Sequence, residues 1–195
     1  GGKAGSQIEV QVAGSELEGA SRIYFSHPSI SAIPKRSPPD EVDPYGRPMA
    51  DWFIVNIADG VGPGIYEARV FGRFGLSNPR AFVVGNLPEL ADNDLADNGK
   101  NGKNHTPQTA MPVRVGTILN GRCDEGQVDY YRVSLAKDQH VVFDCWSQRV
   151  DSRLDPTLLL YNSSGVEMLR VGDADRQDPV LDFQAPEDGQ YLLAV

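Results

Sequence analysis

The stretch Asp129-Tyr130-Tyr131-Arg132-Val133-Ser134-Leu135 decides the fold class of this chain. Its aromatic and β-branched residues alternate with polar ones, and this period of two is typical of a half-buried β-strand. A second stretch of the same character follows shortly afterwards, Val141-Val142-Phe143-Asp144-Cys145-Trp146. The sequence therefore predicts two strands here, and it predicts that Tyr130 and Tyr131 point to opposite faces of a sheet.

Short segments of the same kind recur in both directions from this point, separated by Gly, Pro, Asn and Asp. Helix signals are scarce, and regularly spaced short strands are typical of sandwiches and barrels. The sequence therefore predicts an all-β fold. The expected strands lie at residues 8–12, 23–25, 52–57, 66–70 and 81–84 in the first half, and at 113–119, 129–135, 141–146, 157–161, 166–169, 180–183 and 191–195 in the second half.

The segment from Pro34 to Pro48 contains five prolines and several charged residues. Proline cannot donate a hydrogen bond to a sheet ladder, so we expect a long surface loop or an insertion here. Such a loop is either a solvated excursion or a contact surface, since long loops in compact domains are often functional.

A break in composition separates the two halves. Residues 85–109 are rich in Asp, Asn and Gly and lack aromatic residues, which favours a flexible linker. The sequence predicts one β-sandwich at residues 1–84, the linker at 85–109, and a second β-sandwich at 110–195.

The composition excludes several classes of function. The chain has 195 residues, 40% of them hydrophobic, and a formal net charge of −9, without a basic patch. This charge balance argues against binding to nucleic acid. No apolar run reaches the roughly 18–20 residues that cross a bilayer, so we expect no membrane insertion. Of the three histidines, His105 lies in the predicted linker, and His27 and His140 have no Ser or Asp partner at a recognisable catalytic spacing, so we expect no enzymatic activity.

The first half resembles the TIG/IPT family of immunoglobulin-like modules. The resemblance covers residues 1–84 and is carried by the opening stretch 5–20 and by two glycine-containing stretches near the end of the module, 62–70 and 75–79. It implies an Ig-like β-sandwich. The proline-rich segment 34–48 and a shortened first strand depart from the family pattern.

The second half resembles the bacterial pre-peptidase C-terminal (PPC) domain, which is related to the collagen-binding modules of clostridial collagenases. The resemblance covers residues 108–195 and is carried by segments 120–122, 128–133, 154–158, 172–175, 178–186 and 188–193. It implies a jelly-roll-like β-sandwich that continues for one more strand past Val195. The tandem of the two modules is similar to large exported proteins of planctomycete-type bacteria.

The second resemblance also implies a calcium site. Its collagen-binding members hold Ca²⁺ with acidic residues of the segment that leads into the sandwich, together with loop carboxylates. The matching positions here are Glu89, Asp92, Asn93, Asp94 and Asp129. Gln127 stands where a further Asp is common in the family, and this removes one charge. The alternative is a hydrophilic linker with ordinary turn aspartates.

Two further pairs of residues are candidates for structural or binding roles. Cys123 and Cys145 either form one disulfide in an oxidising compartment or remain two buried thiols. Tyr131 and Trp146 either form an exposed aromatic platform for a ligand or belong to the core.

These observations predict a non-catalytic structural or adhesive module pair of a larger protein at the cell surface, outside the cell or in the periplasm. Its expected partners are other domains of the parent chain, neighbouring subunits, or surface polymers that meet the faces and edges of the sheets. The alternative is an accessory module of a secreted hydrolase that binds a collagen-like protein or a glycan.

Overall fold

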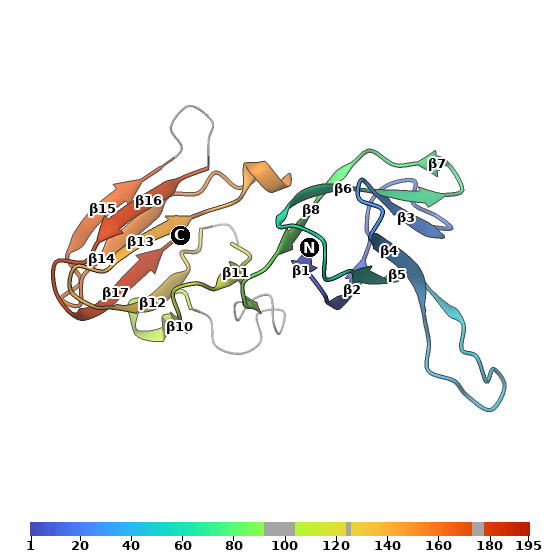
Figure 1. Cartoon of the computed structure of the whole chain (residues 1–195), viewed down its shortest axis with the longest axis horizontal. Coiled ribbons are helices and arrows are strands. Elements are labelled where there is room, and N and C mark those ends of the chain that lie inside the picture. The colour runs from blue at the N-terminus through green and yellow to red at the C-terminus, as the bar shows by residue number, and fades with distance from the viewer. Residues whose placement is uncertain (92–103, 124–125, 173–177) are drawn as a thin grey trace. The chain divides into compact units, whose positions relative to one another are not determined.

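The structure is a computed structural model that describes residues 1–91, 104–123, 126–172 and 178–195. Its elements are β-strands and two single-turn 3-10 helices in these residues, so the chain is all-β as predicted. Neither of these helices has the length and hydropathy that a membrane span requires. The chain divides into two compact units, Gly1–Asn86 and Leu87–Val195. Figure 1 shows both units.

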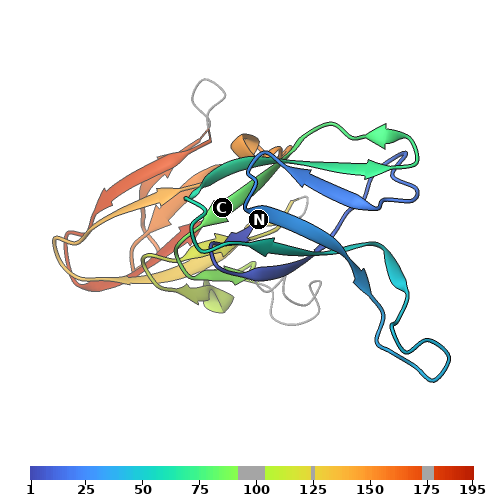
Figure 2. The ribbon, with the colours of Figure 1, turned by 45° about the vertical axis from the view of Figure 1, so that its right-hand side comes forward.

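Unit 1 is a sandwich of two sheets. The first sheet has the order β1-β8-β6-β3, with β7 paired to β6, and the second has the order β2-β5-β4. Side chains from both sheets share one core, so the sheets pack face to face (Figures 1 and 2): Ile30, Val55, Ile57, Val61, Phe82 and Val84. The strands are β1 (Gly2–Lys3), β2 (Gln7–Gln11), β3 (Arg22–Phe25), β4 (Ile30–Arg36), β5 (Pro48–Ile57), β6 (Gly64–Gly72), β7 (Gly75–Leu76) and β8 (Arg80–Gly85).

Strand β4 corrects the interpretation of the proline-rich segment. Pro34 lies within β4, opposite Phe53 of β5, and the register shifts between Pro34 and Arg36. A proline is tolerated here because β4 is an edge strand and the ladder is already interrupted at that point. The predicted loop is therefore shorter than residues 34–48, and β4 and β5 form a hairpin whose connection runs from Ser37 to Arg47.

Unit 2 is built from a five-stranded sheet of order β10-β12-β17-β14-β15, the pair β13-β16, and the short parallel pair β11-β9. Side chains from the first two share one core: Val133, Leu135, Val141, Leu158, Leu160, Leu181, Phe183, Ala185 and Tyr191. The elements are β9 (Glu89–Ala91), η1 (Pro107–Thr109), β10 (Met111–Val113), β11 (Ile118–Asn120), β12 (Tyr130–Leu135), β13 (His140–Asp144), η2 (Gln148–Val150), β14 (Leu158–Tyr161), β15 (Glu167–Val171), β16 (Val180–Gln184) and β17 (Gly189–Ala194).

Gly85 and Asn86 of segment 85–109 belong to unit 1, and the other described residues of the segment belong to unit 2. Strand β9 pairs in parallel with β11, and at the other end the carbonyl of Asn104 accepts a hydrogen bond from the backbone N–H of Tyr130 at 2.7 Å. Thr106 then caps η1 in a reciprocal arrangement with Thr109. Strand β10 begins two residues after this capped turn and pairs with β12. Both described ends of the expected linker are thus fixed by backbone hydrogen bonds.

Candidate functional site

The carboxylate of Asp129 is the centre of a buried polar cluster beside the first residue of β12. The Asp129 side chain is fully buried, its Oδ1 lies 3.0 Å from Nδ1 of His105, and its Oδ2 accepts a hydrogen bond from the Cys123 thiol at 3.3 Å. Backbone hydrogen bonds of 3.0 Å in both directions join Asp129 to Val195. An imidazole, a thiol and a carboxylate are thus in one place, but the carboxylate is closed to any substrate, which favours a structural role.

Asn104 extends this cluster. Its side chain has no exposed area, and within the described part of the chain its Oδ1 and Nδ2 atoms have no hydrogen-bond partner. Burying an amide without partners costs about 1–3 kcal/mol. The segment 104–109, part of the predicted linker, therefore carries a residue whose burial needs an explanation. The capping signal Thr106-Pro107 was the available indication that this segment is ordered.

Of the predicted calcium residues, the structure describes Glu89 and Asp129, and these two have different partners. Glu89 accepts a hydrogen bond from Nδ2 of Asn120 at 3.1 Å, and Asp129 contacts His105 and Cys123. The remaining predicted ligands, Asp92, Asn93 and Asp94, lie outside the described residues. In the part of the chain that the structure describes, no three His, Cys, Asp or Glu side chains are grouped to hold a metal.

A second site lies in the loop that follows β13. The loop contains Trp146 and is bound by Asp178, which lies just before β16. The Asp178 carboxylate accepts hydrogen bonds from the backbone N–H groups of Ser147, Gln148 and Arg149 and from Nε of Arg149, at 2.7–3.1 Å. Burial by itself would raise the pKa of Asp178, but these donors lower it from 3.8 to about 2. The loop is therefore fixed by a buried, ionised carboxylate.

This fixed loop holds Trp146 at the surface. The indole Nε1 donates to Asp144 at 2.8 Å, the guanidinium of Arg149 lies 5.1 Å from the ring centroid, and 42% of the residue remains exposed. The Arg149 guanidinium also donates to Asp144. The structure thus holds Trp146 in one orientation with part of its surface open to solvent, as an aromatic platform requires.

Tyr131, the other predicted platform residue, belongs to the core. It is only 4% exposed, whereas its neighbour Tyr130 is half-buried, so the predicted alternation of the two tyrosines holds. The prediction that Tyr131 forms a ligand platform is wrong, because Tyr131 lies on the same buried face of β12 as Val133 and Leu135.

The two cysteines are not joined in a disulfide. Cys123 contacts Asp129, and the half-buried Cys145 packs against the core of unit 2. The structure thus shows the second of the two alternatives, two separate thiols. Burial raises the pKa of Cys145 to about 11, with the charge of Asp178 adding to the effect.

Unit 1 carries a feature that sequence reasoning identified only in outline, the hairpin connection Ser37–Arg47, which we call the arm. Figures 1 and 2 show it extending beyond the two sheets of unit 1. Val42 and Tyr45 near its tip are 84% and 80% exposed. The tip also carries three acidic residues, Asp40, Glu41 and Asp43, and no basic residue before Arg47.

Hydrogen bonds within the arm hold these side chains in place. Oδ1 of Asp40 accepts from the backbone N–H groups of Val42 and Asp43 at 2.9 and 2.6 Å. Oδ1 of Asp43 accepts from the N–H of Tyr45 at 3.1 Å. At the base, the Arg36 guanidinium donates to the carbonyls of Tyr45 and Gly46 at 3.0–3.2 Å. The arm is therefore an ordered turn structure that presents two apolar side chains to solvent.

The outer surface of β3 and β6 forms a second exposed feature, which we call the arginine–aromatic face. The antiparallel register sets Arg22 opposite Phe71 and Tyr24 opposite Arg69, and Phe71 also lies opposite Leu76 of β7. The rings of Tyr24 and Phe71 meet edge to face at a centroid distance of 6.4 Å. All three apolar side chains are exposed. Glu67 pairs with Arg69 at 3.1 Å on this face.

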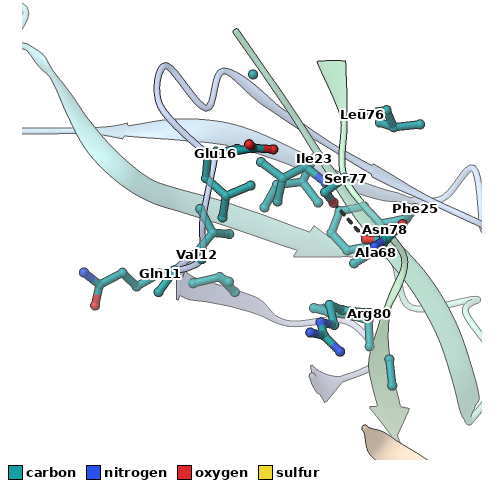
Figure 3. A pocket seen from close by; sticks show the side chains of 18 of the residues that line it. Gln11, Val12, Glu16, Ile23, Phe25, Ala68, Leu76, Ser77, Asn78 and Arg80 are labelled. Atoms are coloured by element: carbon teal, nitrogen blue, oxygen red, sulfur yellow. Dashed lines mark hydrogen bonds between the residues drawn. The ribbon is translucent and has the colours of Figure 1, made fainter. Parts of the chain in front are cut away.

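A cavity of about 610 Å³ opens between the two sheets of unit 1 (Figure 3). Its walls are mixed: Val12, Ile23, Phe25 and Ala68 line it together with polar residues, Glu16 and Arg80 among them. Ser77 uses its hydroxyl within the unit, accepting from the N–H of Val70 at 2.9 Å and donating to the Asn78 carbonyl at 2.8 Å. Ser77 thus ties the segment after β7 to β6, and we assign no ligand to this cavity.

Comparisons with known proteins identify no family for this chain. No protein-family model and no curated protein matches the chain. Among solved structures, the SGBP-B protein of the Bacteroides ovatus mixed-linkage glucan utilization locus, solved in complex with a mixed-linkage heptasaccharide, matches at 9% identity. The match covers 99% of this chain and 73% of that one with a TM-score of 0.32, which is too low to establish a shared fold or to transfer a ligand.

Proposed function

We propose that this chain is a non-catalytic structural and adhesive module pair of a larger exported protein, and that the arm is its contact element. The single observation that carries the proposal is the exposure of Val42 and Tyr45 on an ordered projection. Isolated exposed apolar residues are ordinary on protein surfaces, but two of them held at the tip of a projecting hairpin favour a binding role.

The internal hydrogen bonds of the arm support the same proposal. An element that is already ordered before it binds loses less conformational entropy on binding, so the same contact area gives a higher affinity. Tyr45 also suits a contact, since tyrosine offers a large apolar surface with few rotatable bonds and is enriched at interfaces. The hydrogen bonds of Asp40 and Asp43 fix the arm backbone at Val42 and Tyr45.

The test compares the adhesion of three proteins attached to beads: wild type, Val42→Ser/Tyr45→Ser, and Val166→Ser. Val166 is 59% exposed in the turn between β14 and β15 and provides a matched apolar control outside the arm. The surfaces are collagen fibrils, insoluble polysaccharides and the protein itself. We expect wild type and Val166→Ser to be retained on at least one surface, and the arm variant to be lost from it.

Equal retention of the arm variant and wild type on every surface would refute the arm as contact element. Retention of wild type on none of them would refute the adhesive function. Release of soluble sugars or peptides from any surface by the purified protein, in proportion to its concentration, would contradict the non-catalytic part of the proposal.

The polymer-binding alternative has its own support in Trp146. An indole that is fixed by Asp144 and Arg149 and partly exposed is suited to stacking on a sugar ring or a prolyl ring. Under this alternative, Trp146→Ala lowers retention on collagen or polysaccharide by at least tenfold, while the arm variant is retained like wild type. The opposite pattern supports the arm.

A further inference from the structure

We propose that the arm of one copy docks on the arginine–aromatic face of a second copy, so that the modules associate head to tail. This inference rests on the proposed function and names the partner of its contact element. We identify the partner as a second copy of this chain because two surfaces of the same unit are complementary. The arm presents Val42 and Tyr45 among acidic residues, and the face presents Tyr24, Phe71 and Leu76 beside arginines.

The charges of the two surfaces are opposite in sign. The arm carries Asp40, Glu41 and Asp43, and one base, Arg47, whose Nε lies 3.7 Å from Oδ2 of Asp43, so the acidic residues outnumber the bases. The face carries Arg22 and Arg69 with one acid, Glu67, and Arg73 follows in the turn between β6 and β7, its guanidinium 5.8 Å from the Phe74 ring centroid. In a chain with a net charge of −9, two copies repel each other on average. The arginine–aromatic face differs from the rest of the acidic surface because its arginines outnumber its acidic residues. An acidic segment of another copy can therefore bind there without charge repulsion.

The arm cannot satisfy the face of its own unit. The arm connects β4 and β5 in one sheet, whereas the face is the outer surface of the opposite sheet. Figures 1 and 2 agree that the arm leaves unit 1 on the side away from β7. The contact is therefore between copies. Because the two surfaces are different, each copy keeps a free arm or a free face after pairing, and the association continues as an open chain.

The first experiment measures the average mass of the whole chain by sedimentation velocity from 5 to about 500 μM in low salt. We expect the mass to rise with concentration beyond that of a dimer, and to fall back as salt screens the contact. Tyr45→Ser in the arm and Arg22→Glu on the face should each weaken association at least tenfold, while Val166→Ser behaves as wild type. A wild type that stays monomeric, or that stops at a dimer, overturns the inference.

The second experiment uses the two defective variants together. Tyr45→Ser keeps a competent face and Arg22→Glu keeps a competent arm, so their mixture should form one-to-one pairs and stop there. A charge exchange tests the same contact differently: Glu41→Arg and Arg22→Glu each weaken association, and the chain that carries both should regain it. Glu41 suits this purpose because the turn of the arm is held by Asp40 and Asp43.

The mixture staying monomeric, or the double variant staying as weak as the single ones, contradicts the docking. Circular dichroism melts of each variant separate a lost contact from a lost fold. If bead adhesion to a polymer through the arm persists while wild type stays monomeric, this inference fails and the proposed adhesive function stands.

Discussion

The Asp178 carboxylate accepts a 2.8 Å hydrogen bond from the backbone N–H of Ser147. Asp178 lies 31 residues after Ser147 in the sequence. Together with the neighbouring donors of Gln148 and Arg149, this contact fixes the Trp146 loop to the strand that begins at Val180. Burial opposes ionisation, and the donors outweigh it, so the pKa of Asp178 falls to about 2. The loop is thus stabilised by a charge that acid removes.

We expect the stability of unit 2 to fall between about pH 4 and pH 2. A carboxyl group whose pKa is lower in the folded state contributes fully above its unfolded value of 3.8, and the contribution is lost as the pH falls through the folded value. The difference corresponds to about 2 kcal/mol. Urea unfolding of wild type and Asp178→Asn at several pH values measures it.

Asp178→Asn should lower the free energy of unfolding by about 2 kcal/mol at pH 7 and flatten its dependence on pH below 4. The matched control is Glu187→Gln, which removes an exposed carboxylate and should change stability by less than about 0.5 kcal/mol. Identical pH profiles for wild type and Asp178→Asn would show that Asp178 is not the responsible group.

The Cys145 thiol should resist alkylation in the native protein. With burial and the Asp178 charge raising its pKa to about 11, the thiolate fraction at pH 8 is on the order of 10⁻³. Peptide mapping after timed exposure to iodoacetamide should show Cys145 reacting at least tenfold faster in guanidinium than in buffer. Equal rates in the two conditions would contradict the burial of the thiol.

The strands of this chain could be predicted where apolar residues alternate regularly. The expected strands at 129–135 and 180–183 agree with β12 and β16 to within one residue, because the buried positions Tyr131, Val133, Leu181 and Phe183 follow the period of two. Strand β4 was missed because Pro34 was interpreted as a strand breaker. An edge position can hold a proline, but a single sequence does not show which strand lies at an edge.

The candidate sites were less accessible to sequence reasoning because their contacts are distant in sequence. Asp178 meets residues 29–31 positions away, and Asp129 meets His105 across 24 positions. The sequence placed Glu89 beside Asp129 by resemblance, whereas the structure places Asn104 and His105 there. A composition rich in Asn and Gly indicated a linker, but it did not show where that linker ended and the packed segment began.

Calcium binding stays a prediction and has a direct measurement. If Asp92, Asn93 and Asp94 hold Ca²⁺, a concentration of about 100 times Kd stabilises the protein by roughly 2.7 kcal/mol. We expect the melting midpoint of unit 2 to be about ten degrees higher in millimolar Ca²⁺ than in EDTA. Asp92→Asn/Asp94→Asn should abolish the difference. Equal midpoints for the wild type in Ca²⁺ and EDTA would refute the site.

The pair His105–Asp129 should contribute far more to stability than the similar pair His140–Asp182. Both join an imidazole to a carboxylate, at 3.0 and 2.5 Å, but Asp129 is fully buried whereas His140 and Asp182 are both exposed. Removing His105 leaves the buried Asp129 carboxyl group without this neighbour and costs about 1–3 kcal/mol, and an exposed pair contributes less than about 1 kcal/mol. Urea unfolding of His105→Ala and His140→Ala makes the comparison.

A double-mutant cycle separates the contact from the loss of the His105 side chain itself. Asp129→Asn removes the buried charge and keeps its volume, so His105→Ala should be less damaging in that background than in wild type. We expect a coupling of at least about 1 kcal/mol. Additive effects would mean that Asp129 is stabilised by its other contacts, including the thiol of Cys123, a weak donor. His105 would then serve to fill space beside Asn104, and the segment that enters β10 would be held by its backbone hydrogen bonds alone.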